Sequence, residues 1–232
     1  MILPLDYGSL APAVEMARRL RGVVGLFKIG FQLFTSGGPA AVEKISRYGK
    51  IFLDLKFHDI PNTLAGAVRS ACELPGIEIM HVHALGGLEM MRAAREALPK
   101  SGTRPKLIAV TVLTSHDARS LARVGVSGTP ADRVIKLAAL ARQAGLDGVV
   151  CSAQECARLR RKFGEQFLLV PGGIRPAGAA VNDQKRVATP GEAIRNGASY
   201  LLVGRPITAA KNPRKAAEEI VREMQDALAE KI

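Results

Sequence analysis

The chain has 232 residues, of which 47% are hydrophobic and 23% are charged, and its formal net charge is +12. The apolar fraction excludes a disordered chain, and glycine without a three-residue period excludes a collagen-like one. No apolar run approaches the roughly 20 residues of a membrane span. The opening MILPLD has no basic segment, so we expect no signal peptide, and three cysteines without a CxxC pair favour the reducing cytoplasm.

The positive charge favours a negatively charged partner. Nucleic acid, an acidic membrane and a phosphorylated small molecule all meet that description, and net charge does not choose among them. Aromatic residues make up 4% of the chain and Trp is absent, which leaves few platforms for stacking the bases of single-stranded nucleic acid. The sequence also has no run of five Lys or Arg residues that would indicate a basic tail.

Short apolar runs alternate along the chain with longer amphipathic or alanine-rich segments. We expect strands at 2–6, 23–29, 50–55, 77–83, 106–112, 147–151, 167–171 and 199–203. We expect helices at 9–21, 37–48, 62–74, 87–98, 130–144, 153–163, 190–196 and 213–229. Strands that alternate with helices and have continuous apolar runs are typical of parallel βαβ units covered on both faces. Eight units predict one (β/α)8 TIM-barrel domain over residues 1–232, with an open doubly wound sheet as the alternative.

In such a barrel, polar residues at the C-terminal ends of the strands mark the active face. Lys28 ends the second predicted strand, and Asp54 and Lys56, two residues apart, project to the same side of the third. Asp59 follows in the loop before Pro61. These four charges predict a cluster in which a constrained lysine is a usable proton donor. Simple ion pairs that shield a helix start are the alternative.

Two segments with glycine and arginine follow the last two predicted strands. PGGIRP contains Arg175, and VGRPIT contains Gly204 and Arg205. Backbone N–H groups and arginine bind anions, and the loops after strands seven and eight of TIM barrels frequently hold a phosphate. We therefore expect a phosphate site here, with residues 176–186 as its lid. An idle surface connection is the alternative for that segment.

The histidines are expected to have structural or substrate-positioning roles rather than to bind a metal. His81 and His83 share one face of the fourth predicted strand, but no third metal ligand is evident. A metal ion would also be repelled by Lys28 and Lys56, so we expect no metal site. Cys151 and Cys156 are expected to serve in packing.

DLKFHDIPNT, residues 54–63, resembles the DxKxxDIPNT signature of the orotidine 5′-phosphate decarboxylase family, in its bacterial type. The likeness covers nearly the whole chain through LPLD, FKIG, VHALGG, VTVLTS, GIRP, NDQKRVATPGEAI and VGRPIT, in that order. A wider group of sugar-phosphate barrel enzymes shares DxKxxD alone, whereas the ordered set is highly specific. The chain departs from the family at Pro171-Gly172, where Thr-Pro is usual, and at His81, to which we assign no role.

The resemblance implies decarboxylation of orotidine 5′-monophosphate to uridine 5′-monophosphate and CO2 in pyrimidine biosynthesis, by a homodimer without metal or organic cofactor. It implies Lys56 as the proton donor, Asp54 and Lys28 as the groups that hold its ammonium, and Asp59 as a residue of the neighbouring subunit's site. The residues that it implies as substrate contacts are Asp6, Lys28, Asp54, Ile60, Thr63, Thr114, Arg175, Gln184, Gly204 and Arg205. We accordingly expect no nucleic-acid or membrane partner. A Mg²⁺-dependent sugar-phosphate decarboxylase or aldolase of the wider group is the nearest alternative, and a nucleic-acid-binding protein is a more distant one.

Overall fold

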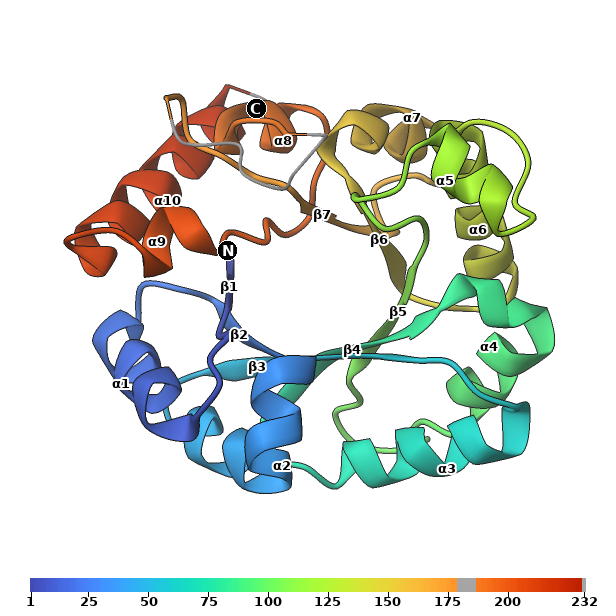
Figure 1. Cartoon of the computed structure of the whole chain (residues 1–232), viewed down its shortest axis with the longest axis horizontal. Helices are drawn as coiled ribbons and strands as arrows, with labels where there is room; N and C mark the ends of the chain where they lie inside the picture. Colours follow the sequence, from blue (N-terminus) through green and yellow to red (C-terminus); the bar gives the residue numbers. More distant parts are fainter. Residues whose placement is uncertain (179–186, 231–232) are drawn as a thin grey trace.

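Parallel strands form a sheet that follows the order of the chain and curls around a central axis (Figure 1). The computed structural model describes residues 1–178 and 187–230. Within them the strands are β1 (Ile2–Pro4), β2 (Leu26–Gly30), β3 (Lys50–Phe57), β4 (Ile77–His83), β5 (Lys106–Val110), β6 (Gly148–Ser152) and β7 (Leu168–Gly172). Every neighbouring pair from β1·β2 to β6·β7 is parallel, as the alternation of apolar runs and helical segments predicts.

Residues 199–203, expected as an eighth strand, close the cylinder through a few hydrogen bonds. On one side the Ser199 N–H donates to the Leu169 carbonyl of β7 at 2.8 Å. On the other, the Ile2 N–H of β1 donates to the Leu201 carbonyl, also at 2.8 Å. The predicted barrel is therefore confirmed, with a short bridging segment in the eighth position and without the open edges of a doubly wound sheet.

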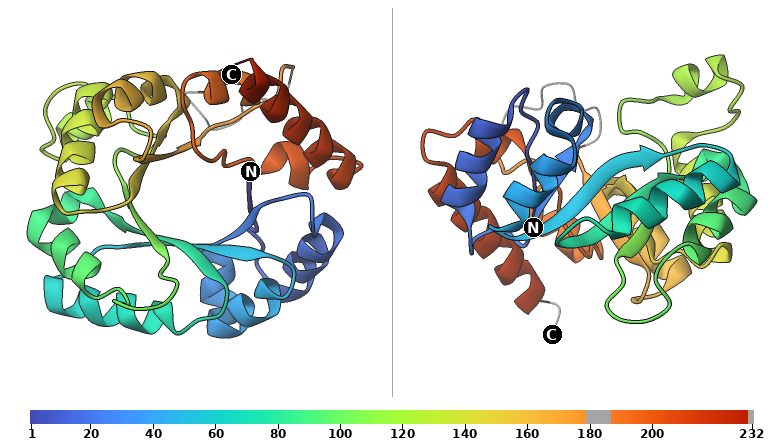
Figure 2. Two further views of the ribbon diagram at one scale, coloured as in Figure 1. Left: turned by 180° about the vertical axis from the view of Figure 1, so that it is seen from behind. Right: turned by 90° about the horizontal axis from the view of Figure 1, so that it is seen from below.

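The helices lie outside the sheet and cover it (Figures 1 and 2). They are α1 (Leu10–Leu20), α2 (Phe31–Ser46), α3 (Pro61–Cys72), α4 (Gly87–Glu96), α5 (Ala118–Arg123), α6 (Pro130–Gln143), α7 (Ala153–Phe163), α8 (Pro190–Arg195), α9 (Arg205–Thr208) and α10 (Pro213–Ala229), with the 3₁₀ turn η1 (Ala84–Gly86) before α4. None of these helices has both the length and the apolar character needed to cross a membrane.

The helices differ from the sequence expectation at α2 and at the short helices α5 and α9, which were not expected. α2 begins at Phe31 rather than at residue 37, and it bends at Gly38, whose φ of 52° a glycine adopts without strain. α5 was not expected, because its six residues are too few to show a clear period. It is held at its start by a capping box between Asp117 and Ser120, and it projects beyond the ring of helices at one end of the barrel (Figure 2).

An apolar layer fills the inside of the barrel beneath the C-terminal strand ends. It consists of the fully or nearly buried side chains of Ile2, Leu26, Phe52, Ile79, Ile108 and Val170. Six strands contribute one residue each, as expected for inward-facing positions of a small barrel. This layer supports the polar residues that lie farther along the same strands.

Candidate active site

The polar side chains of β2, β3 and β4 meet directly above the apolar layer. Lys28, Asp54 and His81 each lie two residues beyond a member of that layer, so they also face inward. Their exposed fractions are 6%, 6% and 2%. Because buried charges are costly without partners, their pairing decides what this layer can do.

The Asp54 carboxylate is the centre of the cluster. Its Oδ2 accepts from the Lys28 ammonium at 2.7 Å. Its Oδ1 lies 2.5 Å from Lys56 Nζ and 2.8 Å from His81 Nε2. Lys28 also contacts Asp6 Oδ1 at 3.1 Å, so carboxylates and lysines alternate from β1 to the end of β3.

This pairing keeps the carboxylate and the lysine charged. Burial by itself raises the pKa of Asp54, but the hydrogen bond from His81 and the positive charges of Lys28 and Lys56 hold that pKa far below its usual range. For Lys28, burial lowers the pKa, while the charges of Asp54 and Asp6 outweigh it and raise the pKa above the ordinary value. The result is a buried, hydrogen-bonded array of fixed charges.

Lys56 has an unusual backbone. Its φ of 42° is the only positive value at a non-glycine position in the described chain, and such a conformation stores strain. It lies where the β3·β4 pairing shifts register, between Leu53 and Phe57. Its side chain is 28% exposed and its ammonium lies 5.1 Å from the centre of the Phe31 ring. Of the two lysines in the cluster, Lys56 is thus the one that reaches open space.

Two neighbours of the cluster were missed as functional residues by the sequence analysis. A Cβ at Gly30 would lie 2.8 Å from Lys28 Nζ and 3.5 Å from oxygens of both Asp54 and Asp6, so the missing side chain makes room for the ion pairs. His81 contacts both Asp54 and Lys56. The sequence did contain an indication for His81: it lies two residues after Ile79 on the same strand and therefore shares its inward face. Nothing in the sequence alone singles out Gly30.

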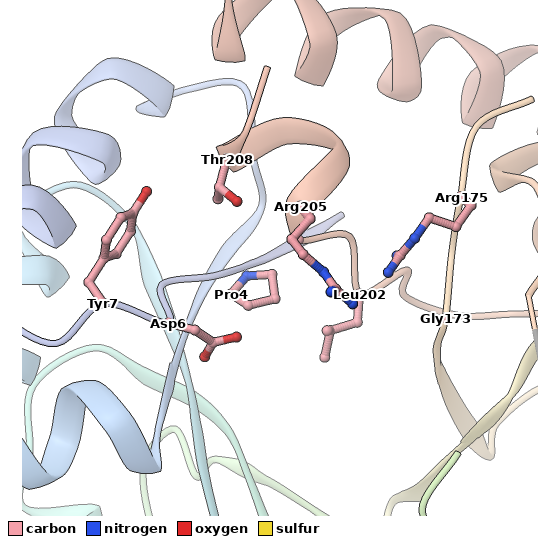
Figure 3. Close-up of a pocket in the computed structure, with 9 residues that line it drawn as sticks. Pro4, Asp6, Tyr7, Gly173, Arg175, Leu202, Arg205 and Thr208 are labelled. Atoms are coloured by element: carbon pink, nitrogen blue, oxygen red, sulfur yellow. The ribbon is translucent and has the colours of Figure 1, made fainter. Parts of the chain in front are cut away.

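The arginines of the predicted phosphate site line a cavity of about 440 Å³ (Figure 3). Arg175 is 8% exposed and donates to the Ile174 carbonyl at 2.8 Å, whereas Arg205 is exposed. Their guanidinium groups extend into the same space, with Asp6 across from them. The remaining lining residues are Pro4, Tyr7, Gly173, Leu202, Gly204 and Thr208. Two cations on one wall suit a multiply charged anion.

Asp59 does not join the ion pairs around Asp54. Its Oδ1 accepts from the N–H of Ile60 at 2.6 Å. It lines a second cavity, of about 320 Å³, together with Lys56 and Thr63. Asp59, Ile60 and Thr63 are exposed, and the Ile60 side chain is 67% exposed despite being apolar. The structure thus brings three of the four predicted charges into contact and leaves Asp59 on the rim.

Other predicted residues lie apart or outside the described chain. Thr114 is half-buried in the loop between β5 and α5 and lines neither of the two cavities above. Gln184 and residues 179–186 of the predicted lid lie outside the described residues. The unusual Pro171-Gly172 pair forms the end of β7, where Pro171 keeps its carbonyl bonded to the Leu202 N–H at 3.2 Å.

His83 is the last residue of β4, and its ring stacks on that of His58 at 5.5 Å. Partial burial, the neighbouring histidines and Lys56 lower the pKa of His83 to about 4. Among residues 1–178 and 187–230, no three His, Cys, Asp or Glu side chains converge as metal ligands. Cys151 and Cys156 are buried, with sulfurs 3.7 Å apart.

Fold and site together define a (β/α)8-barrel protein with a buried lysine–carboxylate array and a dibasic cavity at the C-terminal ends of its strands. Residues 1–220 match the model of the orotidine 5′-phosphate decarboxylase / HUMPS family. The chain belongs to this family.

Individual relatives agree with that assignment. The chain is 51% identical over 227 residues to the orotidine 5′-phosphate decarboxylase of Nitrosococcus oceani, covering 97% of each protein. It is 51% identical over 225 residues to that of Alkalilimnicola ehrlichii, covering 97% of this chain and 95% of the relative. The crystal structure of orotidine 5′-phosphate decarboxylase from Lactobacillus acidophilus is similar with a TM-score of 0.85 and 37% identity, over 97% of this chain and 98% of that one.

Proposed function

We propose that the protein decarboxylates orotidine 5′-monophosphate to uridine 5′-monophosphate, a step of pyrimidine biosynthesis, as one cytoplasmic barrel domain. The observation that carries the proposal is the Lys28–Asp54–Lys56 array beside a cavity with two arginines. Orotidylate has a phosphate at one end and a ring carboxylate at the other, so one molecule satisfies both parts of the site. The names of the relatives support the same reaction.

Lys56 is the proton donor in this proposal. When the bond between the ring and its carboxylate breaks, CO2 leaves and the bonding electrons remain on the ring carbon. The Lys56 ammonium, held at 2.5 Å by Asp54, then transfers a proton to that carbon and regains one from solvent. The reaction needs no oxidant, no reductant and no metal, so the proposal includes no cofactor.

Charge stabilisation is the main catalytic effect that the array offers. The developing carbanion meets an ammonium that is already oriented, so little reorganisation is required during the reaction. If Asp54 or Asp59 lies about 4 Å from the substrate carboxylate, the repulsion between the two carboxylates in the ground state is of the order of 4 kcal/mol at an effective dielectric constant near 20. Its release in the transition state corresponds to roughly a thousandfold in rate.

Arg175, Gly204 and Arg205 hold the phosphate, and Asp6 binds the ribose hydroxyls. Arg205 offers exposed donors, and the buried Arg175 offers donors whose position is restricted by the Ile174 carbonyl. Binding energy gained at the phosphate is realised far from the bond that breaks, and it orients the ring over Lys56. Thr114 and Gln184 are proposed contacts on the pyrimidine side and at the phosphate.

A Mg²⁺-dependent decarboxylase or aldolase acting on a sugar phosphate is the second candidate, because the matching family includes the HUMPS proteins. An acidic metal ligand would be needed near the end of β2. That position holds Lys28, whose ammonium is paired with Asp54 at 2.7 Å. A buried cation there repels a metal ion. The array therefore favours the metal-independent reaction.

We further propose a homodimer in which Asp59 completes the neighbouring subunit's site. The exposed Asp59, Ile60 and Thr63 next to Lys56 support it, since an exposed apolar side chain beside a site suits a protein contact. Inactive Lys56→Ala and Asp59→Ala chains, mixed in equal amounts, are expected to regain about a quarter of the wild-type sites, because half of the dimers are hybrids with one intact site each. No recovery after demonstrated subunit exchange contradicts a shared site.

The direct test of the reaction follows the ultraviolet absorbance of orotidylate with purified protein, with and without a chelator. We expect equal turnover in both samples and formation of uridylate and CO2. Activity that the chelator abolishes and Mg²⁺ restores would favour the metal-dependent alternative. Tight, salt-dependent RNA binding without turnover would favour a nucleic-acid-binding protein.

A further inference from the structure

We propose that His81 is a positioning residue: its imidazole ring links the Asp54 carboxylate to the Lys56 backbone and keeps the proton-donating lysine in place. The inference rests on the proposed function, because it assigns to Lys56 the role described above. It concerns a residue to which the family resemblance assigned no role. Its basis is that one buried ring makes a contact to each of the two central residues through different nitrogens.

The two contacts determine where the ring carries its proton. The backbone N–H of Lys56 points at His81 Nδ1 at 3.1 Å, so Nδ1 must supply a lone pair. The proton of the neutral ring then lies on Nε2, which is 2.8 Å from Asp54 Oδ1 and donates to it. A fully protonated ring would direct an N–H at the N–H of Lys56. The geometry therefore assigns a neutral imidazole with its proton on Nε2.

The first contact lies where the strand pairing is interrupted. Between Leu53 and Phe57 the β3·β4 register shifts, and Lys56 adopts its positive φ of 42° inside that interval. A residue in this conformation persists only where its surroundings hold it. The His81 ring, which comes from the adjacent strand β4, supplies the acceptor for the Lys56 N–H at that irregularity.

The second contact restrains the carboxylate. Asp54 Oδ1 accepts from both Lys56 and His81, so rotation of the carboxylate away from the lysine would also break the bond to the ring. The ring itself is fixed, because it is 2% exposed and packs edge-on against Phe52 with 5.0 Å between ring centres. His81 thus acts through Asp54 and Lys56, and its effect on the reaction is one of orientation.

The kinetic experiment separates the two contacts by substitution. His81→Gln keeps a donor near the position of Nε2, His81→Asn keeps an acceptor near that of Nδ1, and His81→Ala keeps neither. We expect kcat to fall about 100-fold in His81→Ala with KM changed less than about threefold, and about tenfold in the two amide variants. His81→Gln should retain more activity than His81→Asn, because the bond to the carboxylate is charge-assisted.

Thr111→Val is the matched control. Thr111 is 1% exposed and its hydroxyl donates to the Val150 carbonyl at 2.8 Å, so the variant loses one buried hydrogen bond elsewhere in the barrel. We expect its kcat to stay within about twofold of the wild type. A kcat of His81→Ala within about threefold of wild type, or an equal loss in Thr111→Val, overturns the role of His81. Absence of turnover by the wild type overturns the proposed function, and the positioning role with it.

The protonation state is measured on the wild-type protein, so the proposal stays testable if His81→Ala does not fold. Nitrogen NMR of the wild-type protein labelled with ¹⁵N-histidine distinguishes a protonated from an unprotonated ring nitrogen, and loss of a signal in folded His81→Gln assigns it. We expect a protonated Nε2 and an unprotonated Nδ1 at neutral pH. A proton on Nδ1, alone or together with Nε2, contradicts the proposal whatever the kinetics show.

Discussion

The two halves of the barrel's catalytic end handle charge in opposite ways. On the β2–β4 side, Lys28 and Lys56 are matched by carboxylates at 2.5–3.1 Å, and Lys28 and Asp54 are almost fully buried. On the side formed by β7 and residues 203–208, two arginines extend into an open cavity of about 440 Å³ (Figure 3). Asp6 belongs to both, since it contacts Lys28 and lines the cavity.

This difference indicates that one region serves the chemical step and the other serves substrate binding. A buried ion pair is stable only with good geometry and further hydrogen bonds, so the lysine array is built before the substrate arrives. The arginines line an open cavity, in which they can offer charge-assisted bonds to an incoming phosphate. Changes in the first half should therefore affect kcat, and changes in the second should affect substrate capture. The following substitutions test that contrast.

Lys56→Ala should have the largest effect. Loss of the proton donor and of the nearest positive charge is expected to lower kcat at least about 10⁴-fold. Asp54 keeps Lys28 and His81 as partners, so the melting temperature should change little. Lys50→Ala is the control, because Lys50 lies at the other end of β3 and pairs with Glu78 on the surface. Near-normal turnover by Lys56→Ala would refute its role as proton donor.

Arg205→Ala should impair capture of the substrate more than its conversion. We expect kcat/KM to fall about 100-fold through a higher KM, as for the loss of a charge-assisted phosphate contact. In the wild-type protein, added phosphite should fill the phosphate site and restore part of the activity toward a substrate that lacks the phosphate. Arg222→Ala, on the exposed surface of α10, serves as the control. An unchanged KM for Arg205→Ala counts against a phosphate site in this cavity.

Gly30→Ala tests the ion-pair array without removing any of its members. The new methyl group would lie 2.8 Å from Lys28 Nζ and would displace the ammonium from Asp54. We expect kcat to fall about tenfold. The free energy of unfolding should fall by about 1–3 kcal/mol, because the extended backbone tolerates alanine but the buried Lys28–Asp54 ion pair is displaced. Gly66→Ala in α3, where a Cβ has only Arg69 at 4.0 Å, should leave kcat unchanged.

The smallest predicted effect concerns stability at acid pH. The pKa of His83 is lowered to about 4 in the folded protein, below its ordinary value of 6.5. Between these values the unfolded chain binds more protons, so stability falls as the pH drops from about 6.5 to about 4 and levels off below. After allowance for partial exposure, the loss is about 1–2 kcal/mol.

Denaturant unfolding at several pH values measures this loss. His83→Asn should show a shallower decrease in the free energy of unfolding between pH 6.5 and 4 than the wild type. Identical slopes for His83→Asn and wild type would show that His83 titrates normally in the folded protein.

Most of the barrel was predictable from local pattern. Apolar runs of strand length, such as 106–112, alternate with amphipathic segments, and parallel strands joined by helices have few other arrangements. The eighth strand departs most from the prediction: residues 199–203 form a short bridging segment, because they depend on hydrogen bonds to both β1 and β7. α5 was missed because six residues show little periodicity.

The candidate site was predictable in part for the same reason. Asp54 and Lys56 are close in sequence, and the two-residue period places them on one side of a strand. The pattern also suggested that Asp59 would join them, but its carboxylate instead caps the adjacent Ile60 N–H. The sequence could not show that Asp6 would lie beside Lys28, because Asp6 follows β1 in a loop whose path local periodicity does not determine.

By itself the sequence determined the alternation of strands and helices, the placement of Asp54 and Lys56 on one side of a strand, and the family, because these follow from periodicity and from an ordered set of motifs. Only the tertiary structure decided that His81 touches both Asp54 and Lys56 and that Gly30 must lack a side chain. The physical reason is that such contacts join residues on different strands at ångström precision. Strand register and a local bulge determine those distances, and neither can be predicted from the spacing of residues in the sequence.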